Sequence, residues 1–157
     1  MLTHNTQKQA FDMAIVGAGV AGLYMLHRAR QAGLRVRLFD AADGIGGTWY
    51  WNRYPGARVD IESFEYSYSF SRELEQEWHW TERYASQPEL LRYFDHVATR
   101  FGLYEDIQLG TRIESVVFDE RDEAWRIETQ AGETFGARFC VMATGCLSAP
   151  KVPDIPG

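Results

Sequence analysis

Residues 11–22 read FDMAIVGAGVAG, and this stretch decides the fold of the chain. Its first half, residues 11–16, is a short apolar run with β-branched members, which predicts a buried strand. Its second half is a G-x-G-x-x-G pattern built on Gly17, Gly19 and Gly22. A strand that passes through such a turn into a helix directs the N–H groups of the helix N-terminus at a pyrophosphate. The stretch therefore predicts a dinucleotide-binding unit.

The residues after this turn complete a β-α-β unit. Apolar residues recur at helical spacing up to Gly33, which predicts the end of a helix there. Residues 34–39 (LRVRLF) predict a second strand, and Asp40 follows it eighteen residues after Gly22. An acid at this distance accepts hydrogen bonds from ribose hydroxyls and repels a 2′-phosphate, so the first site disfavours NADP and leaves FAD and NAD open. A plain strand-turn-helix with incidental glycines is the alternative interpretation.

A second stretch, residues 46–60, is unusually rich in aromatic rings and reads GGTWYWNRYPGARVD. It has neither helical nor strand periodicity, and exposed rings cost free energy unless a flat apolar partner covers them. Because the stretch begins six residues after Asp40, we expect it to face the bound dinucleotide. Core packing is the alternative explanation for Trp49 and Trp51.

The remaining residues predict one helix and a set of short strands. Residues 86–89 (SQPE) form a capping-box pattern at the start of an amphipathic helix that ends near Gly102. Three further strands are expected at residues 107–118, 124–129 and 134–142. The first and last strands should pair in parallel. The predicted fold is α/β, a Rossmann-like FAD/NAD(P)-binding domain with a central parallel sheet, a β-meander and an aromatic-rich insertion at about residues 41–103.

The composition excludes several classes of function. A formal net charge of −6 argues against nonspecific binding of nucleic acid or anionic membranes. The N-terminus is polar, without a secretion signal, and no apolar run reaches the length of a membrane span, so we expect a cytoplasmic protein. Cys140 and Cys146 are expected to be free thiols, and no metal site is expected. No pattern in the sequence indicates an oligomeric state.

Three motifs together resemble the N-terminal part of Baeyer–Villiger monooxygenases, with the greatest similarity to the phenylacetone and steroid monooxygenase branch. They are GAGVAG at residues 17–22, GGTWYWNRYPGARVDIES at residues 46–63 and ATGCLSAP at residues 143–150. The resemblance covers nearly the whole chain after about residue 10. The aromatic stretch is its specific part, because many flavoproteins share the other two motifs.

The resemblance implies FAD as bound cofactor, NADPH and O₂ as co-substrates, and a ketone that is converted into an ester or lactone through a C4a-peroxyflavin. Matching positions assign the pyrophosphate to Gly17, Gly19, Ala21 and Gly22, and the adenosine ribose to Asp40. They assign the flavin to Gly46, Gly47, Thr48 and Trp49, its isoalloxazine side to Asp60 and Tyr66, and the adenine to backbone groups of Ile113. Cys146 would lie where the chain returns to the cofactor, and Arg58, Val59 and Asp60 would border the nicotinamide.

Asp60 is the residue to which the resemblance assigns a catalytic role. It would position an arginine that stabilises the negatively charged peroxide, an effect of the oxyanion-hole kind. The alternative for Asp60 is a structural cap in a turn. Arg53 and Arg58 have the corresponding alternative of pairing with carboxylates such as Asp60 and Glu62, which would stabilise the fold little.

The predicted organisation is a flexible tail at residues 1–10, an FAD-binding domain at residues 11–150, and the start of a linker to an NADPH domain at residues 151–157. The family's F-x-G-x-x-x-H-x-x-x-W fingerprint and a second G-x-G-x-x-G do not occur in the 157 residues. The isolated chain is therefore expected to be catalytically incomplete. Two other hypotheses are a non-catalytic flavin-binding fragment or module, and the FAD domain of an N-hydroxylating or flavin-containing monooxygenase.

Overall fold

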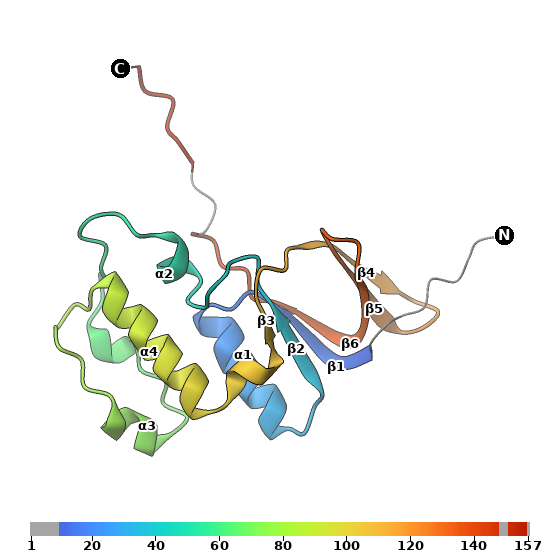
Figure 1. Ribbon diagram of the computed structural model, residues 1–157, viewed down its shortest axis with the longest axis horizontal. Helices are drawn as coiled ribbons and strands as arrows, with labels where there is room; N and C mark the ends of the chain where they lie inside the picture. Colours follow the sequence, from blue (N-terminus) through green and yellow to red (C-terminus); the bar gives the residue numbers. More distant parts are fainter. Residues whose placement is uncertain (1–9, 148–150, 157) are drawn as a thin grey trace.

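The β-α-β unit predicted at the start of the chain forms the centre of the fold (Figure 1). The computed structural model describes residues 10–147 and 151–156. Strand β1 (Ala10–Val16) leads into helix α1 (Val20–Gln31), and strand β2 (Val36–Phe39) follows. Gly33 has a φ of +73° and lies just past the end of α1, where the sequence predicted the helix to stop.

One mixed sheet of six strands, in the order β3-β2-β1-β6-β5-β4, carries this unit. Strand β6 (Thr134–Met142) returns beside β1 and pairs with it in parallel, as predicted. Val16, the last residue of β1, lies opposite Phe39 of β2 and Met142 of β6. The three strands therefore end at the same edge of the sheet, and the loops that follow them meet there.

The β-meander consists of β4 (Ile113–Asp119), β5 (Ala124–Thr129) and β6, which pair antiparallel. The prediction of one strand over residues 107–118 is wrong, because the chain turns at residues 109–112. Before the turn, β3 (Ile107–Gln108) pairs in parallel with β2. Gly110, at a φ of +61°, allows the change of direction. One continuous strand could not serve both edges of the sheet.

Two apolar cores cover the two faces of the sheet. Helix α1 and helix α4 (Gln87–Arg100) pack on one face, where Phe94 is fully buried. The meander curls over the opposite face and closes on the rings of Phe11, Phe39 and Phe135, whose centroids lie 5.1 to 6.4 Å apart. Burying such a ring gains roughly 1.5–3 kcal/mol, so both layers are anchored by apolar contact.

Helix α4 begins where predicted, but its capping box does not form. Ser86 is the N-cap and makes no side-chain cap hydrogen bond. Glu89 does not reach back to Ser86; its Oε1 accepts the N–H of Thr81 at 2.8 Å. The carboxylate is therefore directed toward a distant segment, and Glu89 is only 2% exposed.

The residues between β2 and α4 form an irregular layer that we call the aromatic segment, residues 46–86. Its elements are α2 (Thr48–Trp51), the 3₁₀ helix η1 (Ser63–Tyr66) and α3 (Arg72–Glu77). The rings of Tyr68, Trp78 and Trp80 surround buried Tyr93 at centroid distances of 5.0 to 6.0 Å. The N–H of Tyr68 donates to the Tyr93 hydroxyl at 2.7 Å, and the Tyr68 hydroxyl donates to the carbonyl of Val20 at 2.6 Å. Rings and hydrogen bonds thus join the segment to both helices.

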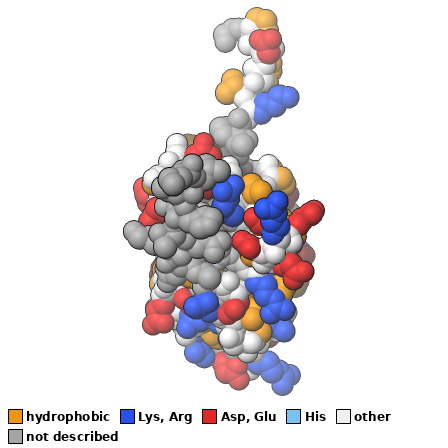
Figure 2. Space-filling model, turned by 90° about the vertical axis from the view of Figure 1, so that its right-hand side faces the viewer, with side chains coloured by type: hydrophobic (Ala, Val, Ile, Leu, Met, Phe, Trp, Pro, Cys, Tyr) orange, Lys and Arg blue, Asp and Glu red, His pale blue; other side chains and the backbone are white. Residues whose placement is uncertain are grey.

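The surface carries charges of both signs. On the face shown in Figure 2, basic and acidic side chains are interspersed among the described residues. No helix within residues 10–147 and 151–156 has the length and apolarity needed to cross a bilayer. Cys146 is exposed, Cys140 is partly buried, and both are free thiols.

The structure gives little information on the predicted domain boundaries at the two ends of the chain. Strand β1 begins at Ala10, the last residue of the predicted tail, and residues 1–9 lie outside the described part. Residues 151–156 are exposed and contain neither helix nor strand, while residues 148–150 of the third motif also lie outside it. The division into a domain and a linker stays a prediction.

Candidate functional site

The turn between β1 and α1, residues 17–22, is packed too closely for larger residues at two of its glycines. A Cβ on Gly22 would lie 1.8 Å from the carbonyl oxygen of Gly17, and a Cβ on Gly17 would lie 2.4 Å from that of Ala143. The turn therefore presses the start of α1 against β1 and against the chain that follows β6. The N-cap residue Gly19 provides no side-chain cap, so the first N–H groups of α1 stay open to an external acceptor. A phosphate is an anion that such a helix start binds.

Asp40 lies at the end of β2 with its carboxylate directed at this turn. Its Oδ2 accepts the N–H of Ala18 at 2.5 Å, and its Oδ1 accepts the N–H of Ala42 at 2.8 Å. Each carboxylate oxygen has a further lone pair, so hydrogen bonds from ribose hydroxyls can be added without breaking either contact. The ribose role of Asp40 stays a prediction, which this position supports.

The diglycine Gly46-Gly47 joins the aromatic segment to the turn through backbone contacts. The N–H of Gly46 donates to the carbonyl of Ala18 at 2.9 Å. A Cβ on Gly47 would lie 2.8 Å from the Cα of Gly19, and the φ of Gly47 is +54°. The two loops therefore meet backbone to backbone, and Thr48 starts α2 directly behind them.

Trp49, Tyr66 and Asp60 lie together behind the diglycine. The indole of Trp49 is 8% exposed and meets the Tyr66 ring edge-on at 5.9 Å. Burial raises the pKa of the Tyr66 hydroxyl, and the nearby carboxylate of Asp60 also raises it. Asp60 is exposed, and its carboxylate has no hydrogen-bond or ion-pair partner among the described residues. A turn cap would need a backbone N–H on that carboxylate, so these contacts do not support the alternative for Asp60.

Arg58 is held by the chain just before α4. Its Nη1 donates to Glu82 Oε2 and to the carbonyl oxygen of Tyr84, both at 3.0 Å. The backbone on either side is paired as in a short antiparallel ribbon, with the N–H of Val59 donating to the carbonyl of Ala85 at 3.0 Å. Val59 is buried, whereas Arg58 and Asp60 are exposed on either side of it.

The suggested pairing of Arg53 and Arg58 with Asp60 and Glu62 is wrong. Glu62 forms its ion pair with Arg83, and Arg53 donates to the backbone carbonyl of Tyr50 at 2.7 Å. Arg58 and Glu62 do not pair with their sequence neighbours because the ribbon brings residues 82–84, more than twenty residues away, beside them. The Asp60 carboxylate stays open as a result.

A cavity of about 430 Å³ opens beside Asp40. Its lining comprises Ala41, residues 110–112, residues 129–131 and Glu133. The N–H of Thr111 donates to the carbonyl of Asp40 at 2.7 Å, which fixes the cavity next to the end of β2. Ile113, predicted to contact adenine, follows the lining residues directly and pairs with β5. Sequence patterns did not single out residues 129–131, because no local motif connects that hairpin to Asp40.

Cys146 lies exposed in the segment that follows β6. The N–H of Ala143 donates to the carbonyl of Val16 at 2.8 Å, and the Asn52 side-chain amide donates to the carbonyl of Leu147 at 3.1 Å. The segment therefore runs from the end of β1 to the end of α2. Cys146 lies between these two anchor points, in the region predicted for the flavin.

Gln87 is a buried residue that the sequence analysis did not single out. It is 8% exposed, and its side-chain amide donates to the carbonyl of Trp49 at 2.5 Å. Its own N–H donates to the carbonyl of Ala57 at 2.9 Å. Gln87, at the start of α4, thus fixes both α2 and the ribbon. Sequence patterns did not identify it, because a polar residue does not contribute to the apolar periodicity of a helix.

The described residues fit an extended dinucleotide. The open N–H groups of α1, with Ala21 exposed in the first turn, suit a pyrophosphate. The carboxylate of Asp40 and the cavity beside it suit an adenosine. Gly47, Thr48 and Trp49 lie at the other side of the turn, where a flat ring would meet the aromatic segment.

Comparison with known proteins agrees with this arrangement. A family model described as pyridine nucleotide-disulphide oxidoreductase matches residues 14–157. Phenazine N-monooxygenase PhzNO1 of Lysobacter antibioticus is 53% identical over 98% of this chain, and acetone monooxygenase (methyl acetate-forming) of Gordonia sp. (strain TY-5) is 48% identical over 93%. The solved structure of an oxidized steroid monooxygenase bound to NADP is 56% identical over 94% of this chain, with a TM-score of 0.89.

The chain spans only a little more than a quarter of these longer proteins: 28% of the phenazine enzyme, 27% of the acetone enzyme and 28% of the steroid enzyme. The similarity confirms the predicted α/β nucleotide-binding fold and the predicted resemblance to Baeyer–Villiger monooxygenases. With its glycine turn, acid and diglycine contact in the expected places, the chain belongs to the pyridine nucleotide-disulphide oxidoreductase family.

Proposed function

We propose that this chain is the FAD-binding part of an NADPH- and O₂-dependent monooxygenase of the Baeyer–Villiger type, which converts ketones into esters or lactones. The observation that carries the proposal is the backbone contact of Gly46 and Gly47 with the turn at residues 17–22. It brings the aromatic segment, with the motif most specific to such enzymes, beside a helix start that can bind phosphate. FAD bound there would supply the chemistry of hydride acceptance and oxygen activation.

The residues around the turn would hold the non-reacting half of the cofactor. The open N–H groups from Gly19 to Gly22 would face the pyrophosphate, and Asp40 would accept the adenosine ribose hydroxyls. The backbone near Ile113 would close the adenine end, next to the 430 Å³ cavity. These contacts orient the cofactor and leave its other end toward the diglycine.

The residues after the diglycine would form one wall around the reacting ring. Trp49 is fixed by the Gln87 contact and by Tyr66, so its indole is a rigid apolar surface that excludes water. Thr48 begins α2 next to Trp49, and Cys146 lies on the segment that follows β6. A rigid wall of this kind keeps the cofactor in one orientation.

Asp60 would act through charge. Its exposed carboxylate has no cation partner among the described residues, and it lies beside Tyr66. We infer that it orients a cationic side chain from another part of the longer protein, which in turn stabilises negative charge during oxygenation. Arg58 and Val59 would border the nicotinamide of NADPH from the same ribbon.

Activity is proposed for the longer protein, because the relatives are more than three times the length of this chain. The isolated chain should retain FAD weakly and should not oxidise NADPH. Gel filtration after incubation with FAD, followed by a flavin spectrum, tests the first point. Stoichiometric retention of FAD would contradict the expectation of weak binding, and any ketone-dependent NADPH oxidation by the isolated chain would contradict the expectation that it is catalytically incomplete.

Oxygenation of an aromatic nitrogen is the second candidate function. It is favoured by one observation, the 53% identity to a protein named as a phenazine N-monooxygenase. The residues proposed to bind FAD do not separate the two reactions, because both reactions are proposed to use the same cofactor.

Product analysis with the complete protein separates the two candidates. The protein is supplied with FAD, NADPH and O₂ and offered acetone, cyclohexanone, phenylacetone or phenazine, and the products are identified by mass spectrometry. We expect an ester or lactone from at least one ketone. An N-oxide from phenazine with no ester or lactone would replace the first proposal by the second.

A further inference from the structure

Glu89 in α4 is a buried carboxylate with one unpaired oxygen. Its side chain is 2% exposed, and its Oε1 accepts the N–H of Thr81 at 2.8 Å. Its Oε2 is buried and has no hydrogen-bond partner among the described residues. Burial of a carboxylate is unfavourable, and the position in the first turn of a 14-residue helix offsets only part of this cost. The contribution of the buried carboxylate to the structure is its hydrogen bond with the N–H of Thr81.

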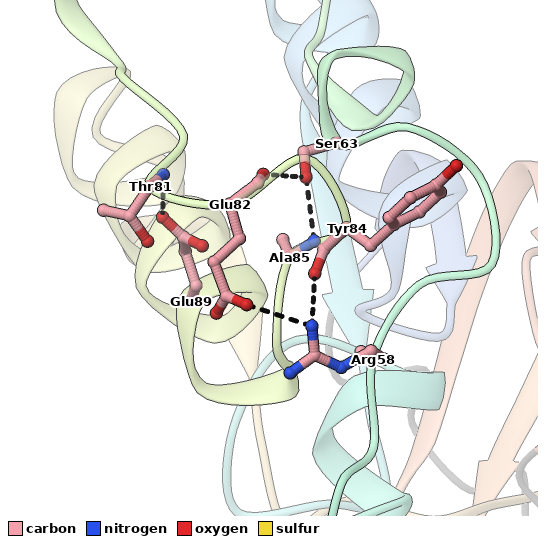
Figure 3. A network of polar contacts seen from close by, with 7 residues as sticks. All are labelled: Arg58, Ser63, Thr81, Glu82, Tyr84, Ala85 and Glu89. Carbon is pink, nitrogen blue, oxygen red and sulfur yellow. Dashed lines mark hydrogen bonds and ion pairs between the residues drawn. The ribbon is translucent and has the colours of Figure 1, made fainter.

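Thr81 begins a short segment, residues 81–85, that connects Glu89 to the ribbon bearing Arg58 (Figure 3). Ser63 fixes the middle and end of this segment. Its hydroxyl donates to the carbonyl of Glu82 at 2.7 Å and accepts the N–H of Ala85 at 2.8 Å. Glu89 therefore holds the segment at its first residue, and Ser63 holds it at residues 82 and 85.

The same segment supplies both acceptors for Arg58. Glu82 Oε2 and the carbonyl oxygen of Tyr84 each accept from Nη1 at 3.0 Å (Figure 3). The side chains of Arg58 and Glu82 are 49% and 45% exposed, so their attraction alone contributes little stability. The orientation of the guanidinium depends on how firmly the segment is held, because one of its two acceptors is a backbone carbonyl of that segment.

We propose that Glu89 is a positioning residue for the reduction of FAD by NADPH. Through Thr81 it fixes residues 81–85, which orient the Arg58 guanidinium at the nicotinamide while NADPH is oxidised to NADP⁺ and its hydride passes to FAD. This inference rests on the proposed function, in which Arg58 borders the nicotinamide. Glu89 itself touches neither cofactor.

The test compares two substitutions of Glu89 in the complete, FAD-loaded enzyme. Glu89→Met removes the acceptor of the Thr81 N–H at similar volume, whereas Glu89→Gln keeps an oxygen that can accept it. The rate of flavin bleaching by saturating NADPH is measured anaerobically by stopped flow. We expect Glu89→Met to slow it by about 10- to 100-fold, since a misplacement near 1 Å has this effect on a bimolecular alignment. Glu89→Gln should restore the rate to within about threefold.

Two readouts distinguish positioning from a general loss of structure. FAD content and photochemical flavin reduction should not change in Glu89→Met, and the exposed substitution Glu128→Gln should leave every rate unchanged. The second readout is a double variant with Arg58→Met. If Glu89 acts through Arg58, adding Glu89→Met to Arg58→Met slows the reaction no further, whereas independent structural effects would multiply.

Glu82→Met, which removes one of the two acceptors of Arg58, keeps the inference testable should Glu89→Met fail to fold, because Glu82 is exposed. It should also slow flavin reduction, and an unchanged rate would overturn the inference. If Arg58→Met slows reduction while the Glu89 and Glu82 variants do not, the inference is overturned and the role of Arg58 stands. If Arg58→Met has no effect, the role of Arg58 and this inference both fail. The assay contains no ketone, so failure of the ketone proposal appears separately, in the product analysis.

Discussion

The turn at residues 17–22 and the aromatic segment at residues 46–86 meet at one edge of the sheet, but different forces hold them. The turn is fixed by the absence of side chains, since a Cβ on Gly22 would lie 1.8 Å from a backbone oxygen. The aromatic segment is fixed by polar side chains of α4, namely Gln87, Glu89 and Tyr93, that reach its backbone groups. The structure of the turn is therefore determined by local residues, whereas the arrangement of the aromatic segment depends on one distant helix.

This division predicts how the two regions respond to substitution. Substitutions that add a side chain in the turn should impair folding and cofactor binding together, because the turn has no space for a larger residue. Substitutions in the aromatic segment should lower the free energy of unfolding by amounts that differ from residue to residue. Some of them should change the reaction rate without changing stability. The following predictions are ordered by their expected effect on the free energy of unfolding.

Gly22→Ala should have the largest effect, a loss of about 3 kcal/mol or more, because the new methyl group overlaps the Gly17 carbonyl. Urea unfolding of the purified chain measures it. Gly33→Ala is the matched control. Gly33 lies just past the C-terminal end of the same helix, α1, and a Cβ added there would have open space around it. Its φ of +73° should cost only about 1–2 kcal/mol. Equal losses in the two variants would show that the close packing of the turn does not decide its stability.

Tyr93→Phe should cost about 1–3 kcal/mol, because it leaves the buried N–H of Tyr68 without an acceptor. Tyr68→Phe removes the other hydroxyl of the same pair and should cost less, about 0.5–1.5 kcal/mol. Its partner, the Val20 carbonyl, lies at the exposed start of α1, where water can replace the lost donor. Denaturant midpoints of both variants give the comparison. If Tyr68→Phe proved the more damaging, the segment would be held mainly through α1 and not through α4.

His27→Phe should affect stability only in acid. Burial lowers the pKa of His27 below its usual 6.5, and the neighbouring Arg28 and Arg30 lower it further. The unfolded chain therefore takes up a proton that the folded chain resists, so His27 lowers stability as the pH falls below about 6.5. One proton limits the slope to about 1.4 kcal/mol per pH unit.

The imidazole of His27 stacks on Phe70 at 4.1 Å, and its Nε2 is buried without a partner, so a phenyl ring suits the site. The stability difference between His27→Phe and the parent chain should grow between about pH 7.5 and pH 5.5. A difference that stays constant with pH would contradict the assignment.

The sequence predicted the turn and the strands beside it because their determinants are local. Glycine spacing, a buried strand and the acid at Asp40 lie within about thirty residues. The predicted parallel pairing of β1 with β6 is also confirmed, since a returning apolar strand has few other places to go. The break at residues 109–112 was not predicted, because apolar periodicity continues across a change of partner strand.

The contacts of the aromatic segment could not be predicted from sequence patterns. Glu89 fits a capping box by spacing, yet its carboxylate accepts the N–H of Thr81 at 2.8 Å, a contact eight residues away along the chain. Arg58 has nearby carboxylates in sequence but binds Glu82. Such partners are chosen by three-dimensional packing, and a period of apolar residues carries no information about which distant carbonyl or carboxylate lies within reach.

Asp60→Ala should have the smallest effect on the free energy of unfolding, within about 0.5 kcal/mol, because its exposed carboxylate forms no hydrogen bond or ion pair with the described residues. In the complete enzyme it should nevertheless slow oxygenation by about 100- to 1000-fold at nearly parental FAD content, the range found for the loss of one preorganised charge-stabilising group. Glu65→Ala, an exposed carboxylate on η1, is the control and should change neither quantity. Stability decides between the two roles of Asp60: a structural cap would lose stability and activity together, whereas a charge that orients a cation loses activity alone. Parental rates in Asp60→Ala would show that the open carboxylate has no part in the chemistry, and the aromatic segment would then act only as a wall.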